Sequence, residues 1–289
     1  MRSWLNLAAL AAVVAALSAW VYYRPDAQPS ETYALSQLKA ADVTRIRLER
    51  LAAAAEPAAH ASSPAAGPAT AIDLERRGEA WHITAPFVAR ADAFQIERLL
   101  SILEARSLGR FAPADLERYG LAQPQSRLTL NGQSFAFGAV NTATREQYVL
   151  TDGAVYAIAL AQRTAIPRDP DALVSKALFA PHEAPVRIEL PQLVAALEDG
   201  TWKFTPARED LGADERNAWA ERWRQALAVR AARHDGKPAE GEVKVELKDG
   251  GTLTFGILQR EPELVLLRAD EGIRYHFFAE TAKRLLSAP

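Results

Sequence analysis

The sequence of 289 residues contains no cysteine. This absence excludes disulfide bonds, a thiolate nucleophile and zinc sites built on cysteine. A surplus of one charge is also missing, because 34 Lys and Arg residues face 36 Asp and Glu residues, for a net charge of −2. The chain therefore lacks the basic surplus typical of nucleic-acid-binding proteins, and we expect no nucleic-acid partner. With 49% hydrophobic residues, it is long enough to form one large or two ordinary domains.

Signatures of catalysis are missing as well. The sequence has no phosphate-binding loop, no dinucleotide-binding glycine motif and no nucleophile elbow. None of its histidines pairs with another histidine at i, i+3 or i, i+4 or with a glutamate in the zinc-protease pattern. These histidines are His60, His82, His182, His234 and His276. We therefore predict no catalytic, cofactor-binding or metal-binding residues and no enzymatic activity.

A long apolar run spans Trp4–Tyr23, with Asn6 and Ser18 as its polar residues. About 20 such residues match the length of a membrane-spanning helix. Aromatic residues stand at both ends of the run, as they do at membrane interfaces. Arg2 precedes the run, whereas the charge of Arg24 is offset by nearby acidic residues. The positive-inside rule then places the N-terminus in the cytoplasm.

These features predict a single-pass anchor at residues 1–24 in a bacterial inner membrane, with the bulk of the chain on the periplasmic side. The alternative is a cleaved signal peptide with a weak cleavage site at Ala16-Leu17-Ser18. The apolar run is longer than the roughly 7–15 residues of a usual signal-peptide core, which favours the anchor. In both cases the body of the protein lies outside the cytoplasm.

Composition divides the rest of the chain. We expect a polar juxtamembrane linker at residues 25–42, a first unit at 43–180 and a second unit at 183–289. Residues 51–70 are rich in Ala, Pro, Ser and Gly and have almost no large apolar side chain. Such a segment does not bury enough surface to offset the entropy lost on ordering. We therefore predict that it is a mobile, dispensable insertion in the first unit.

The two units share a pattern. Trp81 and Trp202 each follow a glycine-containing turn, and Gly138 and Gly256 each follow a phenylalanine in a later hairpin at nearly the same offset. A repeated order of turn, aromatic strand, helix and hairpin indicates one supersecondary unit used twice. We therefore predict an internal duplication in which Trp81 superposes on Trp202 and Gly138 on Gly256.

The fold class that follows is α+β: an N-terminal transmembrane helix and two tandem antiparallel β-rich units, each with a packed helix. In the first unit Asp92 is expected to cap this helix, with Gln95 at the capping-box position. In the second unit Asp214 is the expected cap. Apolar residues at helical spacing predict the buried faces of the two helices. Those residues are Ile96, Leu99, Leu100 and Leu103 in the first unit, and Trp219, Trp223, Ala226 and Leu227 in the second.

Three further helices are expected. One spans residues 113–121, where proline stands at the start and glycine just before the end. The other two, over 171–179 and 280–286, are expected to end the first and second units.

Tryptophans offer two interpretations. Trp81 and Trp202 are either stacking platforms for a sugar or peptide, or large aromatics that fill the core between sheet and helix. Their recurrence favours the core, because a core is duplicated with its fold whereas a site need not be. We therefore predict that both are largely buried. Trp219 and Trp223 form either an exposed partner-binding stripe or, as their helical spacing favours, a buried face.

Short motifs then suggest a family. These are the Trp81-His82-Ile83-Thr84-Ala85-Pro86 strand, Ala91-Asp92, Tyr119-Gly120-Leu121 with Pro124, Phe137-Gly138 and Tyr148-Val149. Together with the anchor they resemble the domain-of-unknown-function family 4340 over most of residues 43–180 and more weakly over the second unit. The resemblance implies one membrane anchor, an extracytoplasmic duplicated domain and genes often next to gliding-motility-type ABC transporters. No catalytic residues are established for that family, so the resemblance supplies none.

Three hypotheses of function follow. The first is a membrane-anchored accessory or scaffold protein that docks on an envelope complex, with an ABC-type transporter as the leading partner. The second is an extracytoplasmic binding module for lipid, glycan or peptide, which a deep apolar pocket between the units would favour. The third is a hydrolase with scattered catalytic residues, which a cleft of convergent acids with shifted pKa values would favour.

Overall fold

A computed structural model describes most of the chain. The described residues are 12–16, 18, 32–50, 71–163, 166–167, 169–208 and 210–287. The predicted span Trp4–Tyr23 lies outside them except for 12–16 and 18, and the predicted insertion at 51–70 lies outside them entirely. Within the described part of the chain, no helix combines the length and hydropathy needed to cross a bilayer.

The first unit is built on an antiparallel sheet of 10 strands. Its strands are β1 Tyr33–Ala34, β2 Arg45–Arg50, β3 Ala71–Arg77, β4 Ala80–Ala85, β5 Ala89–Arg90, β6 Arg106–Phe111, β7 Ser126–Leu130, β8 Gln133–Asn141, β9 Glu146–Thr151 and β10 Ala154–Ala159. Their order in the sheet is β1-β6-β10-β9-β8-β7-β2-β3-β4-β5. Strand β5 is therefore one edge of this sheet.

The second unit is built on an antiparallel sheet of 8 strands. Its strands are β11 Pro185–Leu190, β12 Leu193–Glu198, β13 Thr201–Thr205, β14 Arg230–Arg233, β15 Gly241–Leu247, β16 Thr252–Gln259, β17 Leu264–Arg268 and β18 Ile273–Phe277. Their order is β13-β12-β11-β15-β16-β17-β18-β14. Two β-rich sheets with few helices confirm the α+β class.

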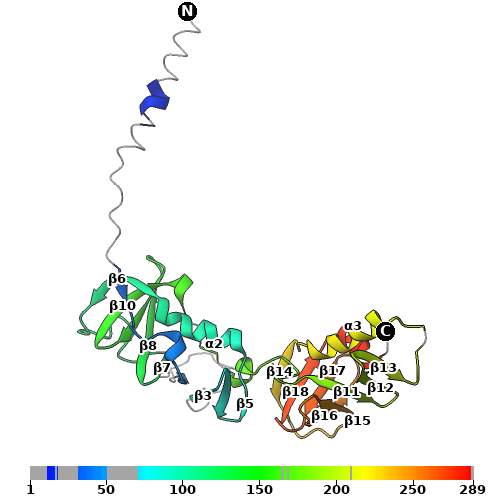
Figure 1. The fold of residues 1–289 in the computed structure, drawn as a ribbon. Helices are drawn as coiled ribbons and strands as arrows, with labels where there is room; N and C mark the ends of the chain where they lie inside the picture. The colour runs from blue at the N-terminus through cyan, green and yellow to red at the C-terminus, as the bar shows by residue number, and fades with distance from the viewer. Residues whose placement is uncertain are drawn as a thin grey trace, which may run out of the picture.

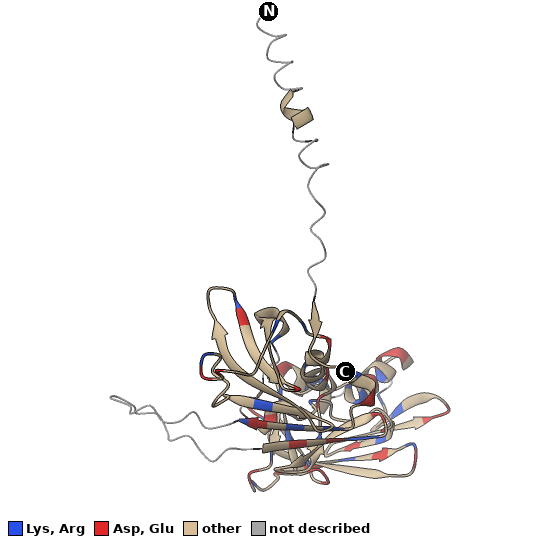
Figure 2. Cartoon of the chain, turned by 90° about the vertical axis from the view of Figure 1, so that its left-hand side faces the viewer, with Lys and Arg blue, Asp and Glu red and all other residues tan. Residues whose placement is uncertain are grey.

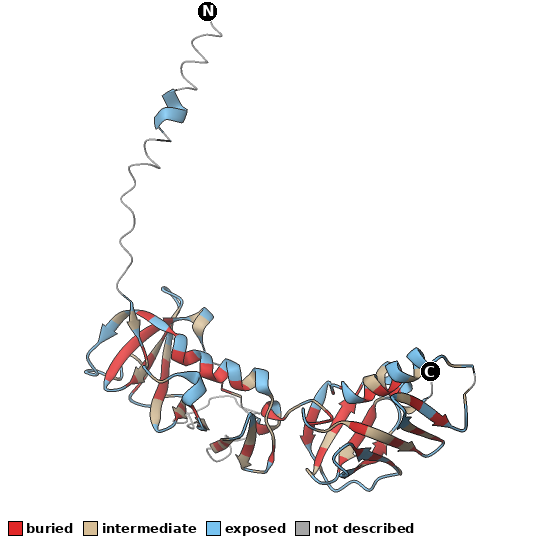
Figure 3. Cartoon of the chain, viewed as in Figure 1, coloured by how far each residue is buried: buried red, intermediate tan, exposed pale blue. Residues whose placement is uncertain are grey.

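Helices cover one side of each sheet. They are α2 Ala93–Leu100, α3 Ala213–Arg224 and α4 Ala279–Leu286, with short 3₁₀ turns η1 Ala40–Asp42, η2 Ser101–Glu104, η3 Leu160–Gln162 and η4 Pro170–Leu173. In the view of Figure 1, α2 lies along the upper side of the first unit and α3 along the upper side of the second. Figure 3 shows the buried residues concentrated on the strands and on the inner sides of these helices.

The N-terminal cap predicted for α2 is confirmed, whereas the one predicted for α3 is wrong. Asp92 caps α2 as predicted, since its carboxylate accepts a hydrogen bond of 3.0 Å from the N–H of Gln95. The cap of α3 is Gly212 and not the predicted Asp214. The reason is that the Glu215 carboxylate accepts the Gly212 N–H at 2.8 Å, so the chain enters the helix before Asp214.

Two predicted helices are wrong. Residues 113–121 form a series of turns, because Asp115 and Gly120 adopt positive φ values of 54° and 64°. The carbonyl of Tyr119 instead accepts the N–H of Ala139 at 2.8 Å, which ties these turns to β8. Residues 171–179 are extended after η4, since their backbone bonds to both units. The helix predicted at 280–286 is confirmed by α4.

The predicted linker at 25–42 is partly folded. Tyr33–Ala34 forms β1 against β6, and Leu35 is buried in the core. The apolar Tyr33, Leu35 and Leu38 account for this, because they pack on the core of the first unit. Strands β6 and β14 were not predicted, since glycine in one and alanine in the other give a weak strand pattern.

Most buried apolar side chains of the two units belong to one contiguous hydrophobic cluster, and Leu121, Ala136 and Val155 form a second, smaller one. Trp219 and Trp223 are fully buried in the larger cluster, and their indole N–H groups donate to the carbonyls of Ser287 and Leu285 at 2.8 Å and 2.9 Å. This confirms the predicted buried face at Trp219 and Trp223, and Ala226 is buried as well. The prediction is wrong for Leu227, which lies past the end of α3 and is 68% exposed. Trp202 is only 8% exposed, as predicted, whereas Trp81 is only partly buried. The prediction that both tryptophans are largely buried is therefore wrong for Trp81.

Candidate functional site

The two units meet along a connector, residues 169–184, that bonds to both of them. On the side of the first unit, the backbone groups of Arg90 and Asp92 bond to the connector at 2.8 Å each. On the side of the second unit, Ala226 and Ala228 do so at 3.0 Å and 2.9 Å. The connector thus adds strand-like pairing beside β5 and just before β14, between the two units (Figure 1). Each unit is therefore attached to the other by backbone as well as by side chains.

Arg90, on the edge strand β5, carries the main ionic link between the units. Its Nε donates to Glu271 of the second unit at 2.5 Å. Its Nη2 donates to the hydroxyl of Tyr275 at 3.0 Å and to the connector carbonyl of Ala177 at 2.9 Å. The Tyr275 hydroxyl in turn donates to Glu271 at 2.9 Å. One guanidinium therefore contacts the first unit's edge, the connector and the second unit at once.

Arg268, at the end of β17, forms a second guanidinium centre. Its side chain is only 3% exposed and pairs with Glu183 of the connector at 2.5 Å. It also pairs with Asp270 at 3.1 Å and donates to the carbonyl of Leu178 at 3.0 Å. Leu178 accepts from Arg90 as well, at 3.3 Å. The two arginines thus converge on the same connector carbonyl from opposite sides.

Electrostatics hold this cluster in its charged form. Burial alone would raise the pKa of Glu183, but hydrogen bonds from Arg268 and from a backbone N–H lower it below its usual value. Burial would likewise lower the pKa of Arg90 and of Arg268, yet their partners raise both. Burial raises the pKa of Tyr275, which therefore stays a neutral donor. Glu183 is therefore an ionised partner of Arg268, a state that suits structure better than general acid catalysis.

A third contact joins the units through an aromatic ring. The guanidinium of Arg233, on β14, lies 4.8 Å from the ring centroid of Phe87, in the loop between β4 and β5. Arg233 also lies 3.6 Å from Asp171 of the connector. A cation over an aromatic face is attractive by its quadrupole, so this contact adds to the ionic links. We refer to the connector and these three arginine-centred contacts together as the junction.

A cleft of about 660 Å³ opens beside the junction. Its apolar wall includes Trp81, Phe179 and Pro181, and its polar groups include Arg77, His82 and His182. Trp81 comes from β4 of the first unit and Phe179 from the connector. Trp81 is thus partly exposed because it borders this cleft, while its predicted equivalent Trp202 packs in the core. The volume falls in the range of small-molecule sites.

His82 is the histidine that the structure places in an unusual setting. Burial lowers its pKa, and the nearby charges of Arg77 and Arg90 lower it further. His82 is therefore neutral at neutral pH. His182 lies exposed on the connector side of the same cleft. The sequence separates these two histidines widely, and the fold brings both to one cavity.

The remaining histidines lie elsewhere. His276 is buried on β18 and bonds to Glu263 at 2.9 Å. His234 lies 3.8 Å from Asp235. His60 lies outside the described residues. Among the residues that the structure places, no group of three or more His, Asp or Glu side chains is arranged to hold a metal ion.

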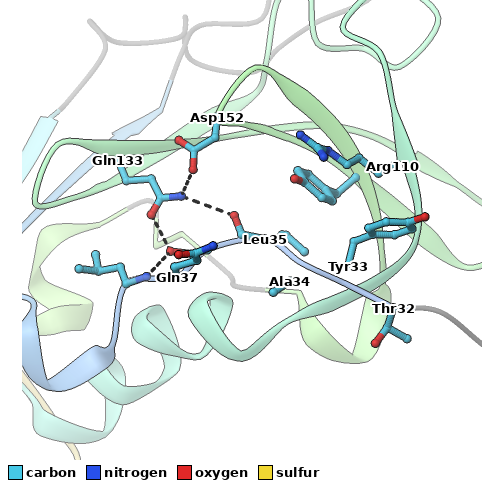
Figure 4. Close-up of a pocket in the computed structure, with 11 residues that line it drawn as sticks. Thr32, Tyr33, Ala34, Leu35, Gln37, Arg110, Gln133 and Asp152 are labelled. Atoms are coloured by element: carbon cyan, nitrogen blue, oxygen red, sulfur yellow. Dashed lines mark hydrogen bonds between the residues drawn. The ribbon is translucent and has the colours of Figure 1, made fainter. Parts of the chain in front are cut away.

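A second hollow, of about 590 Å³, lies at the far end of the first unit. Figure 4 shows Gln133 at its centre, where its amide donates to Asp152 at 2.8 Å and accepts from Ser36 at 2.6 Å. These bonds hold the segment after β1 against the hairpin that joins β9 to β10. Ser36, Gln133 and Asp152 thus form one hydrogen-bonded chain, and we assign these three groups to the folding of residues 32–38.

Charge on the surface is mixed. Figure 2 shows Lys and Arg interspersed with Asp and Glu on the strands and loops of both units. No face of one sign stands out in this view, in agreement with the near-neutral net charge. This distribution gives no support to a nucleic-acid surface.

Four charged residues at the centre of the junction were missed in the sequence. Arg90, Glu183 and the pair Arg268 and Glu271 come from three separate segments, and nothing in the sequence connects these segments. A signal exists for one of them. Arg268 ends the run Leu264-Val265-Leu266-Leu267, where a charge must be paired if the strand is buried.

Comparison with known proteins gives one match. The model of a family described as a domain of unknown function (DUF4340) matches residues 81–236, more than half of the chain. The matched range covers β4, the connector and α3, and so includes the junction's Arg90, Glu183 and Arg233. Neither a curated protein nor a solved structure matches the chain.

Replacing Arg90 by methionine is expected to destabilise the protein by about 2 kcal/mol, because the buried Glu271 carboxylate loses its hydrogen-bonded guanidinium and keeps only Arg268 at 3.5 Å and the Tyr275 hydroxyl. The Arg90 and Glu271 side chains are 13% and 14% exposed. The matched control is Arg47→Met, whose pair with Asp73 is 48% and 34% exposed and whose loss should cost less than about 1 kcal/mol. Urea unfolding measures both values. Equal losses would show that the junction pair is no stronger than a surface pair.

Acid should weaken the junction through Glu183. Because its folded pKa is lowered, the stability it contributes is present above its unfolded pKa and is lost as pH falls through its folded pKa. We expect Glu183→Gln to cost about 2 kcal/mol at neutral pH, as for loss of a charged hydrogen bond. The difference between wild type and Glu183→Gln should shrink below about pH 4.5, as the wild-type carboxyl is protonated. A difference that stays constant down to pH 3 would contradict the assignment.

Proposed function

The chain belongs to the DUF4340 family, and we propose that it is a membrane-anchored extracytoplasmic accessory protein that docks on an envelope complex. It acts by contact and not by turnover. Its favoured partner is an ABC-type transporter of the bacterial inner membrane, in keeping with the family resemblance. The apolar run Trp4–Tyr23 supports an anchor, because its length and flanking aromatic residues suit a membrane-spanning helix.

The body of this protein arose by internal duplication. The strand order supports this proposal: β6-β10-β9-β8-β7-β2-β3-β4 in the first sheet corresponds one to one with β14-β18-β17-β16-β15-β11-β12-β13 in the second. Trp81 on β4 then corresponds to Trp202 on β13. Strands β1 and β5 have no counterpart in the second sheet. Arg90 therefore comes from a strand that one copy has and the other lacks.

The observation that carries the docking proposal is the placement of exposed apolar side chains. Large apolar side chains scattered singly are common on surfaces, but clustered ones mark contact sites. Five exposed ones lie within a few residues of junction contacts, and both units contribute. They are Val88 and Phe94 in the first unit and Leu227, Val229 and Phe278 in the second. A partner that packs on this region contacts both units at once.

The junction is a second observation that supports the docking proposal. Its backbone pairing and buried ion pairs favour one fixed orientation of the two units. A docking surface composed of two units is useful only if their relative orientation is fixed, since ordering them on binding costs affinity. The anchor adds to this effect by raising the local concentration near an integral membrane partner.

The second candidate function is a binding module for lipid, glycan or peptide. The cleft of about 660 Å³ favours it, because it lies beside the junction and has an apolar wall. The two candidates are compatible, since the cleft and the exposed apolar residues belong to neighbouring segments.

Docking is tested by photo-crosslinking in intact cells. We expect a photo-reactive phenylalanine analogue at Phe94 or Phe278 to capture an integral membrane protein, identified by mass spectrometry as an ABC-type permease. The matched control is Leu108, which is 63% exposed, as Phe94 is, but lies on β6 at the far end of the first unit (Figure 1). We expect little capture from that position.

A second arm tests the anchor. Replacing residues 1–24 with a cleavable signal peptide should reduce capture at least tenfold, because it removes the tether and its local concentration. Capture from Leu108 equal to that from Phe94 and Phe278, or no membrane protein captured from either, would contradict the docking proposal.

A further inference from the structure

We propose that the cleft beside the junction binds an amphiphile: an apolar chain that ends in a carboxylate or a phosphate. The inference rests on the second candidate function, the binding module, and names its ligand class. The cleft combines an apolar wall with basic groups that have no ion-pair partner, and this pairing of features suits such a molecule.

The wall offers surface for the apolar part of the ligand. Trp81 faces the cleft from the first unit, and Phe179 and Pro181 face it from the connector. Five alanines also line the cleft and add apolar surface. A partly buried indole gives a ligand chain a large apolar contact and is already held by the core. A chain of about eight carbons is well within a site of this size.

The charged groups of the cleft divide into paired and unpaired ones. Glu183 forms an ion pair with Arg268, and Arg90 forms one with Glu271. Arg224 forms an ion pair with Glu221. In contrast, Arg77 lies exposed at the cleft and makes no ion pair with any described residue. Glu79, the remaining carboxylate of the cleft, is almost fully exposed and lies 3.8 Å from Arg76. The charge left for a ligand is therefore positive.

Two histidines strengthen this assignment. His82 and His182 line the cleft without an acidic partner among the residues that the structure describes, and Nδ1 of His82 is buried with no hydrogen bond. Both rings are able to donate to an anionic head group. An anion next to His82 also offsets the positive charges of Arg77 and Arg90 around it.

Other ligands fit less well. A neutral glycan could use the polar side chains of the cleft, but it would leave the unpaired charge of Arg77 without a counter-charge. A peptide that adds a strand needs a free sheet edge. The edge of β5 is not free, because Ala91 pairs with Val174 and the carbonyl of Arg90 accepts from Ser175.

The test uses the full chain in nanodiscs of zwitterionic lipid. Binding of octanoate, octyl phosphate and octyl glucoside is measured by calorimetry against empty nanodiscs, with protection of His82 and His182 from diethyl pyrocarbonate as the local readout. We expect both anions to bind at least tenfold more tightly than octyl glucoside and to protect both histidines. The tighter anion then identifies the source, a fatty carboxylate or a lipid phosphate.

Variants localise the effect. Arg77→Gln should weaken the binding of both anions about tenfold and leave the binding of octyl glucoside unchanged, because the substitution removes charge and not apolar surface. The matched control is Arg45→Gln, an exposed arginine on β2 outside the cleft, which should change nothing. Trp81→Ala should weaken the binding of all three ligands, because it removes apolar surface that each of them contacts.

The outcomes separate the two proposals. Octyl glucoside binding as tightly as octanoate, with both histidines protected, would overturn the anionic class and leave the binding module in place. No binding by any of the three would overturn both this inference and the second candidate function. Neither result bears on crosslinking to a membrane partner.

Discussion

The ion pair between Arg90 and Glu271 is the interaction on which the rest of this structure depends. It joins an edge strand of one sheet to a turn of the other, and the same guanidinium holds the connector carbonyl of Ala177. Burying charge is costly, so such a pair adds little net stability. It does favour the one arrangement of the units in which the Arg90 guanidinium reaches Glu271, Tyr275 and the connector carbonyl together. The pair therefore selects one orientation of the units. The positions of the cleft and of the five exposed apolar residues near the junction depend on that orientation.

The junction also explains why two similar units need not have similar roles. Under the proposed duplication, Trp202 keeps the core position of its strand, while Trp81 borders a cleft whose other walls come from the connector and from Arg224 of the second unit. Arg90 comes from β5, which the second sheet lacks. Function is then expected where the copies differ, at the additional strand and the connector, and not in the core that they share.

The distance along the sequence between interacting residues explains both the correct predictions and the missed ones. The cap at Asp92, the burial of Trp219 and Trp223 on α3 and the α+β class depend on residues close together in the chain, and all three are confirmed. The helices predicted at 113–121 and 171–179 fail because distant partners take their backbone groups: Ala139 for the first, and both units for the second. No local pattern reports such partners. The cleft was missed for the same reason, since its walls come from separate segments that only the folded chain brings together.

The central claim is that the junction makes the two units one rigid body. The chain contains no cysteine, so spin labels attach only at chosen sites. Glu97 on α2 and Arg222 on α3 are exposed and lie on different units. Double electron–electron resonance between labels at Glu97→Cys and Arg222→Cys measures the distance between the units directly. The account predicts a single narrow distance distribution that broadens when Arg90→Met is added. A broad distribution in the otherwise unchanged chain would contradict it.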